Sequence, residues 1–285
     1  MDSRNDRIVR IDDMMGAGWT VLGTRGTGTN QFADPYGIAI DQAGRIYVTD
    51  TGNDRIVRVD DMSGAAWVTF GGRGAGMHQF SSPRGIAVDQ TGRIYVVDGG
   101  NDRIVRFDDM TGAGWITLGS RGGQANQFLD PAGIALDQSG RIYIIDFGNS
   151  RLVRMDNLTG AGWFVQGPRI QVPIAQTFVG GPVGIAVDRA VRVHVTELRH
   201  SVSRFTLPNM FDLTGMGIRS PGSGVGQFAS PTGVAVDAAD RIYVADTDNR
   251  RIVRSDNMRA AGWVALGAEG RGTNQFDRPI GIAVR

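Results

Sequence analysis

One phrase of eighteen residues recurs through this chain with few changes. Residues 44–61 read GRIYVTDTGNDRIVRVDD, and residues 92–109 read GRIYVVDGGNDRIVRFDD. Related versions follow at 140–157 and 240–257. The recurrence of one phrase at intervals of this length indicates an array of equivalent supersecondary units. No such unit can bury its apolar face without its neighbours. The repeat therefore constrains the fold more than any other feature of the sequence.

Each unit predicts four strands, which we name a to d in chain order. Strand a begins at a recurring Gly, found at 37, 85, 133, 184, 233 and 281. In the first full unit the runs are 37–40, 45–48, 55–58 and 64–70, separated by turns rich in Asp, Asn and Gly. Short runs of β-branched and aromatic residues between such turns are typical of an antiparallel meander.

Two aromatic positions predict the packing between units. The Gly-rich linker between strand d and the next strand a carries a Phe, at 32, 80, 128, 228 and 276, with 178 in a modified version. Strand d carries a Trp at 19, 67, 115, 163 and 263, and Ile218 takes that place in the divergent unit. Because each aromatic side chain can bury about 150–250 Å², we expect both sets in the core.

Four-stranded units of this length pack radially and predict an all-β fold, a β-propeller. Residues 226–253, GQFASPTGVAVDAADRIYVADTDNRRIV, resemble the NHL repeat, and the resemblance covers essentially the whole chain. Propellers of that kind are usually six-bladed, and the six a-type strands agree with that number. We therefore expect one domain over 1–285, with six blades of four antiparallel strands.

The closing blade is expected to be shared by the two chain ends and to lack one strand. Strands in 6–22 and a C-terminal strand at 281–285 supply three members, but no GRIYV segment supplies strand b. Three interpretations stay open: a piece of a longer protein, which we favour, a distorted blade, or a strand from another molecule. We expect a monomer, with strand exchange at the incomplete blade as the route to assembly.

The bulk composition favours few partner classes. The 30 basic residues, all Arg, nearly balance 29 acidic ones, so nucleic acid and membrane are not the expected partners. There is no Cys, and no apolar run approaches the roughly 18 residues of a membrane span. Residues 1–10 are already repeat sequence, so we expect no signal peptide, and the compartment stays open.

Candidate binding residues are those that differ from one repeat unit to the next while the surrounding repeat residues stay the same. Loops joining d to a and b to c should emerge on one face, around the mouth of the central channel. The varying residues there that we single out as ligand-binding are Tyr36, Arg84, Phe147, Arg199 and Asp248. Binding by these residues and relaxed constraint on exposed loops explain the variation equally well.

Two recurring Asp sets are better explained by structure than by chemistry. One set, at 50, 98, 146 and 246, is followed three positions later by Asn, and the other lies at 41, 89, 137, 188 and 237. A catalytic constellation needs one asymmetric arrangement, whereas these recur in nearly every unit. Turn formation and pairing with the neighbouring Arg account for them.

The unit at 164–220 departs from the pattern. In VRVHVTELRHSVSRF, His194 replaces Tyr, Glu197 replaces Asp and His200 replaces Asn. These side-chain types serve in metal and general-base sites, but strand residues alternate faces and need not converge. We favour drift within a decayed repeat over a site, and we expect His78, in a linker, at the surface.

Three functions are compatible with the sequence. We favour a non-catalytic scaffold that presents variable loops to a protein or small ligand, with no cofactor, metal or catalytic residue assigned. The resemblance also implies a lactonase-like hydrolase or lyase with a divalent cation in the channel, although we find no ligand set for it. The third is a truncated or engineered propeller without a function of its own.

Overall fold

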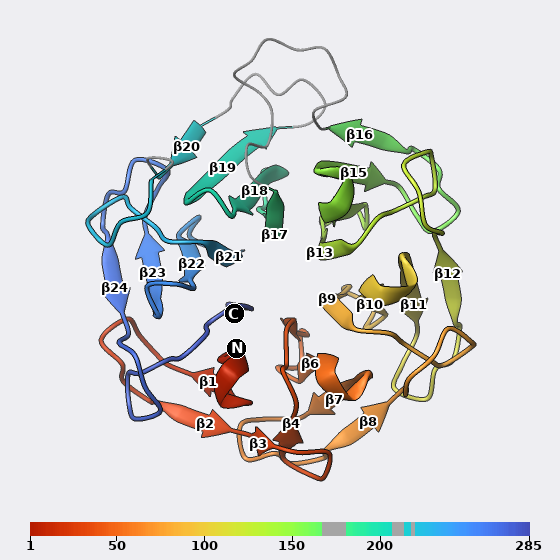
Figure 1. The fold of residues 1–285 in the computed structure, drawn as a ribbon, viewed down its shortest axis with the longest axis horizontal. Helices are drawn as coiled ribbons and strands as arrows, with labels where there is room; N and C mark the ends of the chain where they lie inside the picture. The colour runs from red at the N-terminus through yellow and green to blue at the C-terminus, as the bar shows by residue number, and fades with distance from the viewer. Residues whose placement is uncertain (167–180, 207–213, 218–219) are drawn as a thin grey trace.

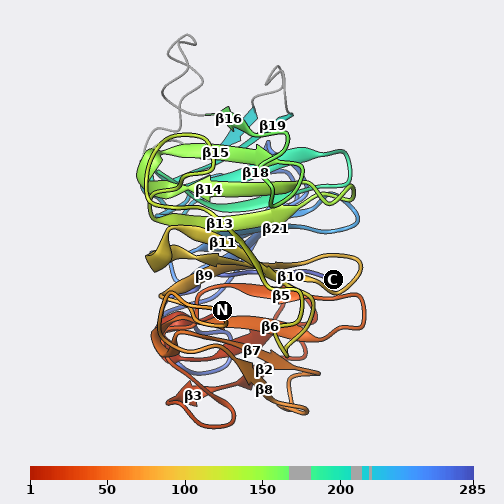
Figure 2. The ribbon, with the colours of Figure 1, turned by 90° about the vertical axis from the view of Figure 1, so that its right-hand side faces the viewer.

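The computed structural model describes residues 1–166, 181–206, 214–217 and 220–285 as a ring of β-sheets around a central axis (Figure 1). Seen edge-on, the ring is a disc about one strand length thick (Figure 2). The β-propeller predicted from the repeat is confirmed. Two expected aromatic positions, Phe178 and Ile218, lie outside the described residues.

Five sheets in the ring have four antiparallel strands each, paired in chain order. They are the first blade, β5 (Ile38–Ile40), β6 (Ile46–Asp50), β7 (Arg55–Val59) and β8 (Val68–Phe70); the second, β9 (Pro83–Val88), β10 (Ile94–Asp98), β11 (Arg103–Phe107) and β12 (Ile116–Leu118); the third, β13 (Pro131–Leu136), β14 (Ile142–Asp146), β15 (Arg151–Met155) and β16 (Phe164–Gln166); the fourth, β17 (Pro182–Val187), β18 (Arg192–Glu197), β19 (Ser201–Thr206) and β20 (Thr214–Met216); and the fifth, β21 (Pro231–Val236), β22 (Ile242–Asp246), β23 (Arg251–Ser255) and β24 (Val264–Leu266).

The expectation of six four-stranded blades is not confirmed, because the described residues form five. The remaining sector, which we call the closing sector, holds a two-stranded sheet of β1 (Ile8–Arg10) and β2 (Thr20–Leu22). Residues 281–285 form no strand. In a complete blade strand a pairs within its sheet only with strand b, and no described strand b stands beside 281–285. A short parallel pair, β3 (Thr24–Arg25) and β4 (Gln31–Phe32), lies in the following linker.

The two ends of the chain nevertheless meet in this sector. The backbone of Asp2 bridges Pro279, and Ser3 N–H donates to the carbonyl of Arg278 at 2.9 Å. The terminal ammonium of Met1 donates to the carbonyl of Gly281 at 2.7 Å. The ring is thus closed by contacts between residues nearly 280 positions apart in sequence.

The linker Phe side chains are the wedges between blades. Phe32, Phe80, Phe128 and Phe228 have no exposed surface, and each ring centroid lies 5.1–5.5 Å from that of the Trp in the blade that follows. The Trp rings are only half-buried, and each Trp lies one position before the observed strand d, although the sequence predicted it within that strand and in the core. They cover the Phe wedges from outside. The Phe276–Trp19 pair, at 5.3 Å, repeats this contact across the chain ends.

A buried carboxylate fastens the preceding linker to its blade in four of the five described blades and in the closing sector. Asp98 accepts hydrogen bonds from Ser81 N–H at 2.7 Å, Asn101 Nδ2 at 2.8 Å and Arg103 Nε at 2.7 Å. The other end of the Arg103 guanidinium donates to linker carbonyls, including that of Gln79 at 2.9 Å. The expectation of Arg pairing is confirmed here, and the same brace recurs at Asp2, Asp50, Asp146 and Asp246.

The described helices are single 3₁₀ turns: η1 (Ser3–Asn5), η2 (Thr51–Asn53), η3 (Gly99–Asn101) and η4 (Phe147–Asn149). No described helix is long and apolar enough to pass through a lipid bilayer. Each turn ends in a residue with left-handed backbone, such as Asp54 at φ 52°. After η1, η2 and η3 that residue is an Asp whose carboxylate caps the next linker, as Asp54 does by accepting the Ser82 N–H at 2.7 Å.

We predict that Asp98→Ala lowers the free energy of unfolding by about 3–5 kcal/mol, because it leaves the Arg103 guanidinium with no anionic partner in a mostly buried place. Urea unfolding followed by Trp fluorescence measures this change. The matched control is Asp109→Ala, at an exposed turn, where we expect a loss of about 1 kcal/mol or less. Equal losses in the two variants would contradict the structural role given to the brace.

Candidate functional site

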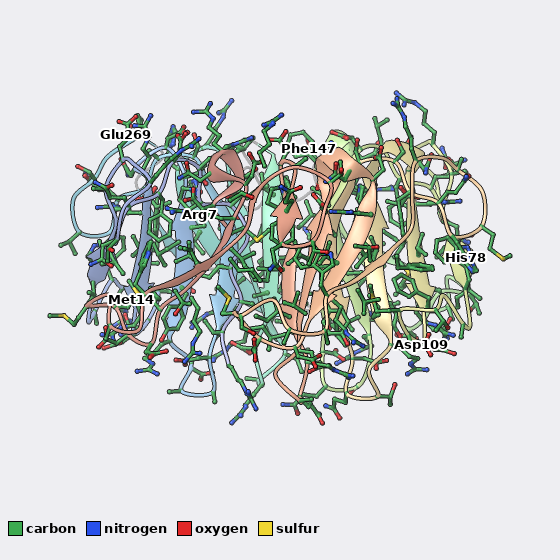
Figure 3. All side chains as sticks on the ribbon, turned by 90° about the horizontal axis from the view of Figure 1, so that it is seen from below. Arg7, Met14, His78, Asp109, Phe147 and Glu269 are labelled. Carbon is green, nitrogen blue, oxygen red and sulfur yellow. The ribbon has the colours of Figure 1, made fainter. Side chains whose placement is uncertain are left out.

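One face of the disc gathers the loops that vary between repeats. The η turns between strands b and c hydrogen-bond to the linkers between d and a: Gly52 N–H to the carbonyl of Ala33, and Gly100 N–H to that of Ser81, both at 2.8 Å. Figure 3 shows Phe147 and Glu269, one from each kind of loop, on the same edge, with Asp109 on the opposite edge. The expectation that both kinds of loop share a face is confirmed, and we call it the loop face.

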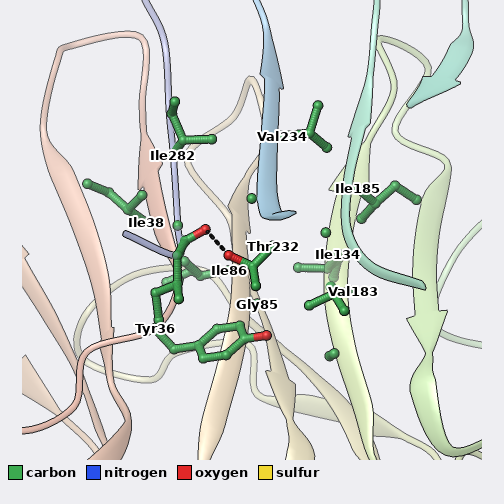
Figure 4. A pocket seen from close by; sticks show the side chains of 17 residues that line it. Tyr36, Ile38, Gly85, Ile86, Ile134, Val183, Ile185, Thr232, Val234 and Ile282 are labelled. Atoms are coloured by element: carbon green, nitrogen blue, oxygen red, sulfur yellow. Dashed lines mark hydrogen bonds between the residues drawn. The ribbon is translucent and has the colours of Figure 1, made fainter. Parts of the chain in front are cut away.

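The channel at the centre of the ring is narrow and apolar. Among the described residues, its wall here consists of the a strands of all five blades and residues 280–282, and Tyr36 and Thr232 are the polar side chains in that lining (Figure 4). Glycine is required at the closest approaches, since a Cβ on Gly233 would lie 2.1 Å from the carbonyl oxygen of Ile280. The repeated Gly-Ile pattern of the sequence therefore sets the channel width.

The volume of this channel decides what it can hold. The cavity measures about 80 Å³. A single water needs about 10–15 Å³ on the same measure, and pockets for small organic ligands are typically about 300–1,000 Å³. This hollow has room for a few waters or for one inserted side chain, and it is smaller than the pockets that enclose organic ligands.

Tyr36 and Arg84 lie together at the mouth of the channel. Burial raises the pKa of the Tyr36 phenol, and the nearby charges of Arg84 and Arg278 partly oppose that shift. The phenol is therefore neutral at physiological pH and available as a hydrogen-bond donor. Arg84 in turn forms an ion pair with Asp130 at 2.8 Å. This cluster offers one aromatic donor beside charges of both signs.

The other three candidate residues are spread around the loop face. Phe147, the first residue of η4, is half-buried, and its ring lies 3.0 Å from where a Cβ of Gly181 would be. Arg199 and Asp248 are exposed on the b–c loops of the fourth and fifth blades. The five residues thus share a face, but the structure brings only Tyr36 and Arg84 into one cluster.

Sequence reasoning missed a second hollow on this face. It has a volume of about 60 Å³ and is lined by Asp248 together with Arg4, Thr247, Arg250, Asp277 and Arg278. Three guanidinium groups and two carboxylates meet there, and Arg4 pairs with Asp277 at 3.5 Å. The only sequence signal was the alignment of residues 2–5 with 50–53, which places Arg4 in a b–c loop. The rest of this cluster depends on ring closure.

His194 takes over a structural role that belongs to Tyr in the other blades. In the first blade the hydroxyl of Tyr47 donates to Asp41 at 3.1 Å. In the fourth blade His194 Nε2 lies 3.0 Å from Asp188 Oδ2, and the ring is almost completely buried. Since an ionised carboxylate only accepts, Nε2 carries the hydrogen. His194 therefore points to its own turn and away from the channel wall.

His200 and Glu197 are also held by local partners. His200 has left-handed backbone, φ 67°, and its Nδ1 accepts the Ser230 N–H at 2.9 Å. It stands where other blades have the capping Asp, so it replaces that Asp and not the Asn inferred from sequence, because this loop is one residue shorter. Glu197 accepts the hydroxyl hydrogen of Ser203. Within the described residues no three His, Cys, Asp or Glu side chains gather as metal ligands.

Comparisons with known proteins agree with this architecture. The NHL repeat model matches residues 32–58, 80–107, 128–155 and 228–254. No curated protein sequence matches the chain. The model does not match the fourth blade, which still folds as a four-stranded sheet, β17 to β20, around its substituted residues.

Solved structures with the same fold include lyases and a binding protein complex. Virginiamycin B lyase from Staphylococcus aureus is 15% identical, with a TM-score of 0.62 over 99% of this chain and 82% of that one. A streptogramin B lyase is 14% identical, with a TM-score of 0.63 over 99% and 81%. A chain of a nidogen/laminin complex is 20% identical, with a TM-score of 0.62 over 80% and 77%. Identities this low show the shared fold alone.

We predict a specific pH dependence at Asp188. Burial opposes ionisation of this carboxyl, but hydrogen bonds from His194 and Arg192 outweigh it and lower the pKa to about 2, from an ordinary 3.8. A lowered carboxyl pKa stabilises the fold above the ordinary value, and the stabilisation is lost as pH falls from about 4 to about 2. Asp188→Asn should therefore cost about 2 kcal/mol at pH 6 and much less near pH 2.

Urea unfolding of both proteins across this pH range measures the difference. His194→Tyr is the matched control, since Tyr donates to the equivalent Asp in the other blades, and we expect a change below about 1 kcal/mol. A difference between wild type and Asp188→Asn that stays constant with pH would show that the ionised carboxylate is not the stabilising form.

Proposed function

We propose that this chain, an NHL-repeat β-propeller, acts as a non-catalytic binding module that docks a partner protein on its loop face. The observation that carries the proposal is a contrast between frame and loops. The buried Asp brace and the Phe wedge recur around the ring, while the side chains displayed between them differ from blade to blade.

The size of the channel favours a protein surface over a small ligand. A cavity of about 80 Å³ offers little enclosed surface, so affinity has to come from contacts spread across the face. The side chains available there include exposed Arg199 and Asp248 and the Arg84–Asp130 pair. Arg and aromatic residues are enriched at protein interfaces, and Tyr36 and Phe147 lie on the same face.

The charges of the loop face favour a partner with polar groups of both signs. Arg84 pairs with Asp130, and the second hollow combines Arg4, Arg250 and Arg278 with Asp248 and Asp277. A surface with charges of both signs selects a partner by where the charged groups of that partner lie, and not by the overall sign of its charge. This agrees with a net charge of +1, and it argues against a polyanion as the main partner.

A similar fold also occurs in a protein crystallised in complex with another protein, as the nidogen/laminin structure shows. That likeness is one of fold only, and it supports the proposal by showing that a ring of this size is compatible with protein recognition.

The second candidate is a lyase or hydrolase with a divalent cation held in the channel. The likeness to virginiamycin B lyase over nearly the whole chain supports it. Against it, the described residues that line the hollow in the channel include no carboxylate or imidazole, and His194, Glu197 and His200 each serve a local hydrogen bond. Elemental analysis of purified protein before and after chelation separates the candidates, since a stoichiometric cation would favour the enzyme.

We predict that the triple variant Arg84→Ala, Arg199→Ala, Asp248→Ala loses at least tenfold in partner capture with its melting temperature nearly unchanged. Arg199 and Asp248 are exposed and Arg84 is half-buried with its charged end paired to Asp130, whereas Tyr36 and Phe147 are half-buried aromatic rings whose removal would disturb packing. Chemical cross-linking in extracts of the source cell, read out by mass spectrometry, identifies and quantifies the partner.

The matched control carries Asp61→Ala, Asp109→Ala and Asn157→Ala, three equivalent turn positions on the opposite face, and should capture as wild type does. Equal capture by both triple variants would move the site away from the loop face. Absence of any captured partner with wild type would favour the third candidate, a propeller without a function of its own.

A further inference from the structure

The two hollows of the loop face adjoin one another. Thr232 lines the hollow in the channel and Thr247 lines the second hollow, and their hydroxyl oxygens lie 2.7 Å apart. The Thr247 hydroxyl also donates to the carbonyl of Pro279 at 2.7 Å. Pro279 stands between Arg278, which lines the second hollow, and Ile280, which lines the channel. A group bound at the mouth of the channel is thus beside the charged side chains of the second hollow.

One hydrogen-bond donor in the channel lining has no partner in the described part of the chain. The side chain of Tyr36 is half-buried and extends from its own blade across the hollow (Figure 4). Its hydroxyl oxygen is not one of the buried atoms that lack a partner, so solvent reaches it. Burial raises the pKa of this phenol, and the hydroxyl therefore keeps its hydrogen at neutral pH. Such a donor is available to an acceptor that enters from the loop face.

The charges that act most strongly on the Tyr36 phenol are two cations and one anion. Arg84 and Arg278 both oppose the rise in its pKa, and Asp130 adds to that rise. Asp130 pairs with Arg84 at 2.8 Å. Arg278 is exposed, and its guanidinium forms no ion pair with a described residue. The mouth of the channel is thus locally positive, and a carboxylate is the complementary group.

The carboxylates of the second hollow do not pair with Arg278. Asp277 pairs with Arg4 at 3.5 Å and with Arg250 at 3.9 Å. Asp248 lines the same hollow, but it forms no ion pair with Arg278. A ligand carboxylate can therefore reach the Arg278 guanidinium without displacing an ion pair between described residues.

Below the mouth the lining is aliphatic. Its side chains there are Ile38, Ile86, Ile134, Ile185, Val234 and Ile282. The hollow of about 80 Å³ has room for one inserted side chain. A charged group would lose its hydration in this lining without gaining a partner, whereas an aliphatic group gains by leaving water. The hollow therefore favours an aliphatic side chain, and the mouth favours a carboxylate.

We propose that the mouth of the channel captures the free C-terminus of the partner protein, and that the last residue of this partner is aliphatic. The side chain of that residue enters the hollow, and its carboxylate accepts hydrogen bonds from the Tyr36 hydroxyl and the Arg278 guanidinium. Both groups of a terminal residue are attached to one Cα, so they can occupy an apolar place and an adjoining polar place at once. This inference rests on the loop-face function proposed above and names the part of the partner that is recognised.

An internal segment of the partner is the poorer fit. An aliphatic residue within a chain brings a neutral carbonyl to Tyr36 and no charge to Arg278. An Asp or Glu side chain brings the charge, but it offers no aliphatic group to the hollow. A terminal residue supplies both groups, and no second residue has to be ordered to do so.

The test adds short peptides to the full chain. The reference peptide is acetyl-Ser-Gly-Ser-Gly-Leu with a free C-terminal carboxylate, and we expect one-to-one binding by calorimetry. The same peptide with a C-terminal amide should bind at least about tenfold more weakly, because charge-assisted hydrogen bonds are lost. A version ending in Gly should also bind at least about tenfold more weakly, because no side chain enters the hollow.

Methyl NMR locates the bound peptide. With isoleucine methyl groups labelled, the reference peptide should shift the signals of Ile38, Ile86 and Ile134, which line the hollow. The signals of Ile56 and Ile104 should stay in place, because these side chains are completely buried in the core between blades. Shifts confined to residues outside the hollow would overturn the proposal.

Two variants remove the proposed contacts one at a time. Tyr36→Phe and Arg278→Gln should each weaken binding of the reference peptide at least about fivefold. The melting temperature should be nearly unchanged, because neither polar group has a partner among the described residues. Arg259→Gln is the matched control, since Arg259 is exposed on a turn of the opposite face, and this variant should bind as wild type does.

No binding of the reference peptide, or of versions ending in Ile or Val, at about 1 mM would overturn the proposal. Equal binding of acid and amide would overturn it in favour of an internal segment, and binding of acetyl-leucine as tight as that of the peptide would do so in favour of a small carboxylate. If the loop-face triple variant loses partner capture while these peptides fail, the proposed function stands and capture of a terminus is rejected. Unchanged capture by that variant would instead reject the proposed function.

Discussion

The structure depends above all on one buried Asp carboxylate in four of the five described blades and in the closing sector. Asp98 and its counterparts connect three segments that the hydrophobic effect alone would not align: the end of strand b, the start of strand c and the linker from the preceding blade. Linkers rich in Gly have little apolar surface of their own, so their backbone groups need fixed partners. The Asp–Arg–Asn brace supplies those partners, and only then can the linker Phe enter its completely buried place between blades.

The same interaction explains how an incomplete ring stays closed. Asp2 lacks most of the strand that precedes its counterparts, yet it accepts hydrogen bonds from Asn5, Arg7 and the Asp277 N–H. The aromatic contact of Phe276 with Trp19 is retained as well. Closure therefore relies on polar and aromatic contacts near the loop face and the rim. In the inner part of the closing sector, β1 pairs with β2 and residues 282–284 pair with no strand among the described residues.

The difference between recurring structural positions and variable loop positions also explains the divergent fourth blade. In the sequence, His194 and His200 lie close together and look like candidate metal-binding or general-base residues. In the structure each one fills the position of another hydrogen-bonding residue, Tyr in one case and a capping Asp in the other. Substitution was tolerated there because imidazole can donate from one nitrogen or accept at the other. At these structural positions, the ability to make the required hydrogen bond therefore matters more than the identity of the residue.

The sequence alone determined the strands, their order within a blade, the radial stacking and the common face of the variable loops. These follow from local periods and turns, which repeat often enough for one unit to be read against the next. It also predicted the pairing of Asp with Arg, since both lie within one hairpin. Only the tertiary structure decided that 281–285 forms no strand, that His200 serves as a cap, and that Arg4 and Arg278 line one hollow. These depend on contacts between chain ends or on the length of one loop, and a local pattern contains no information about them.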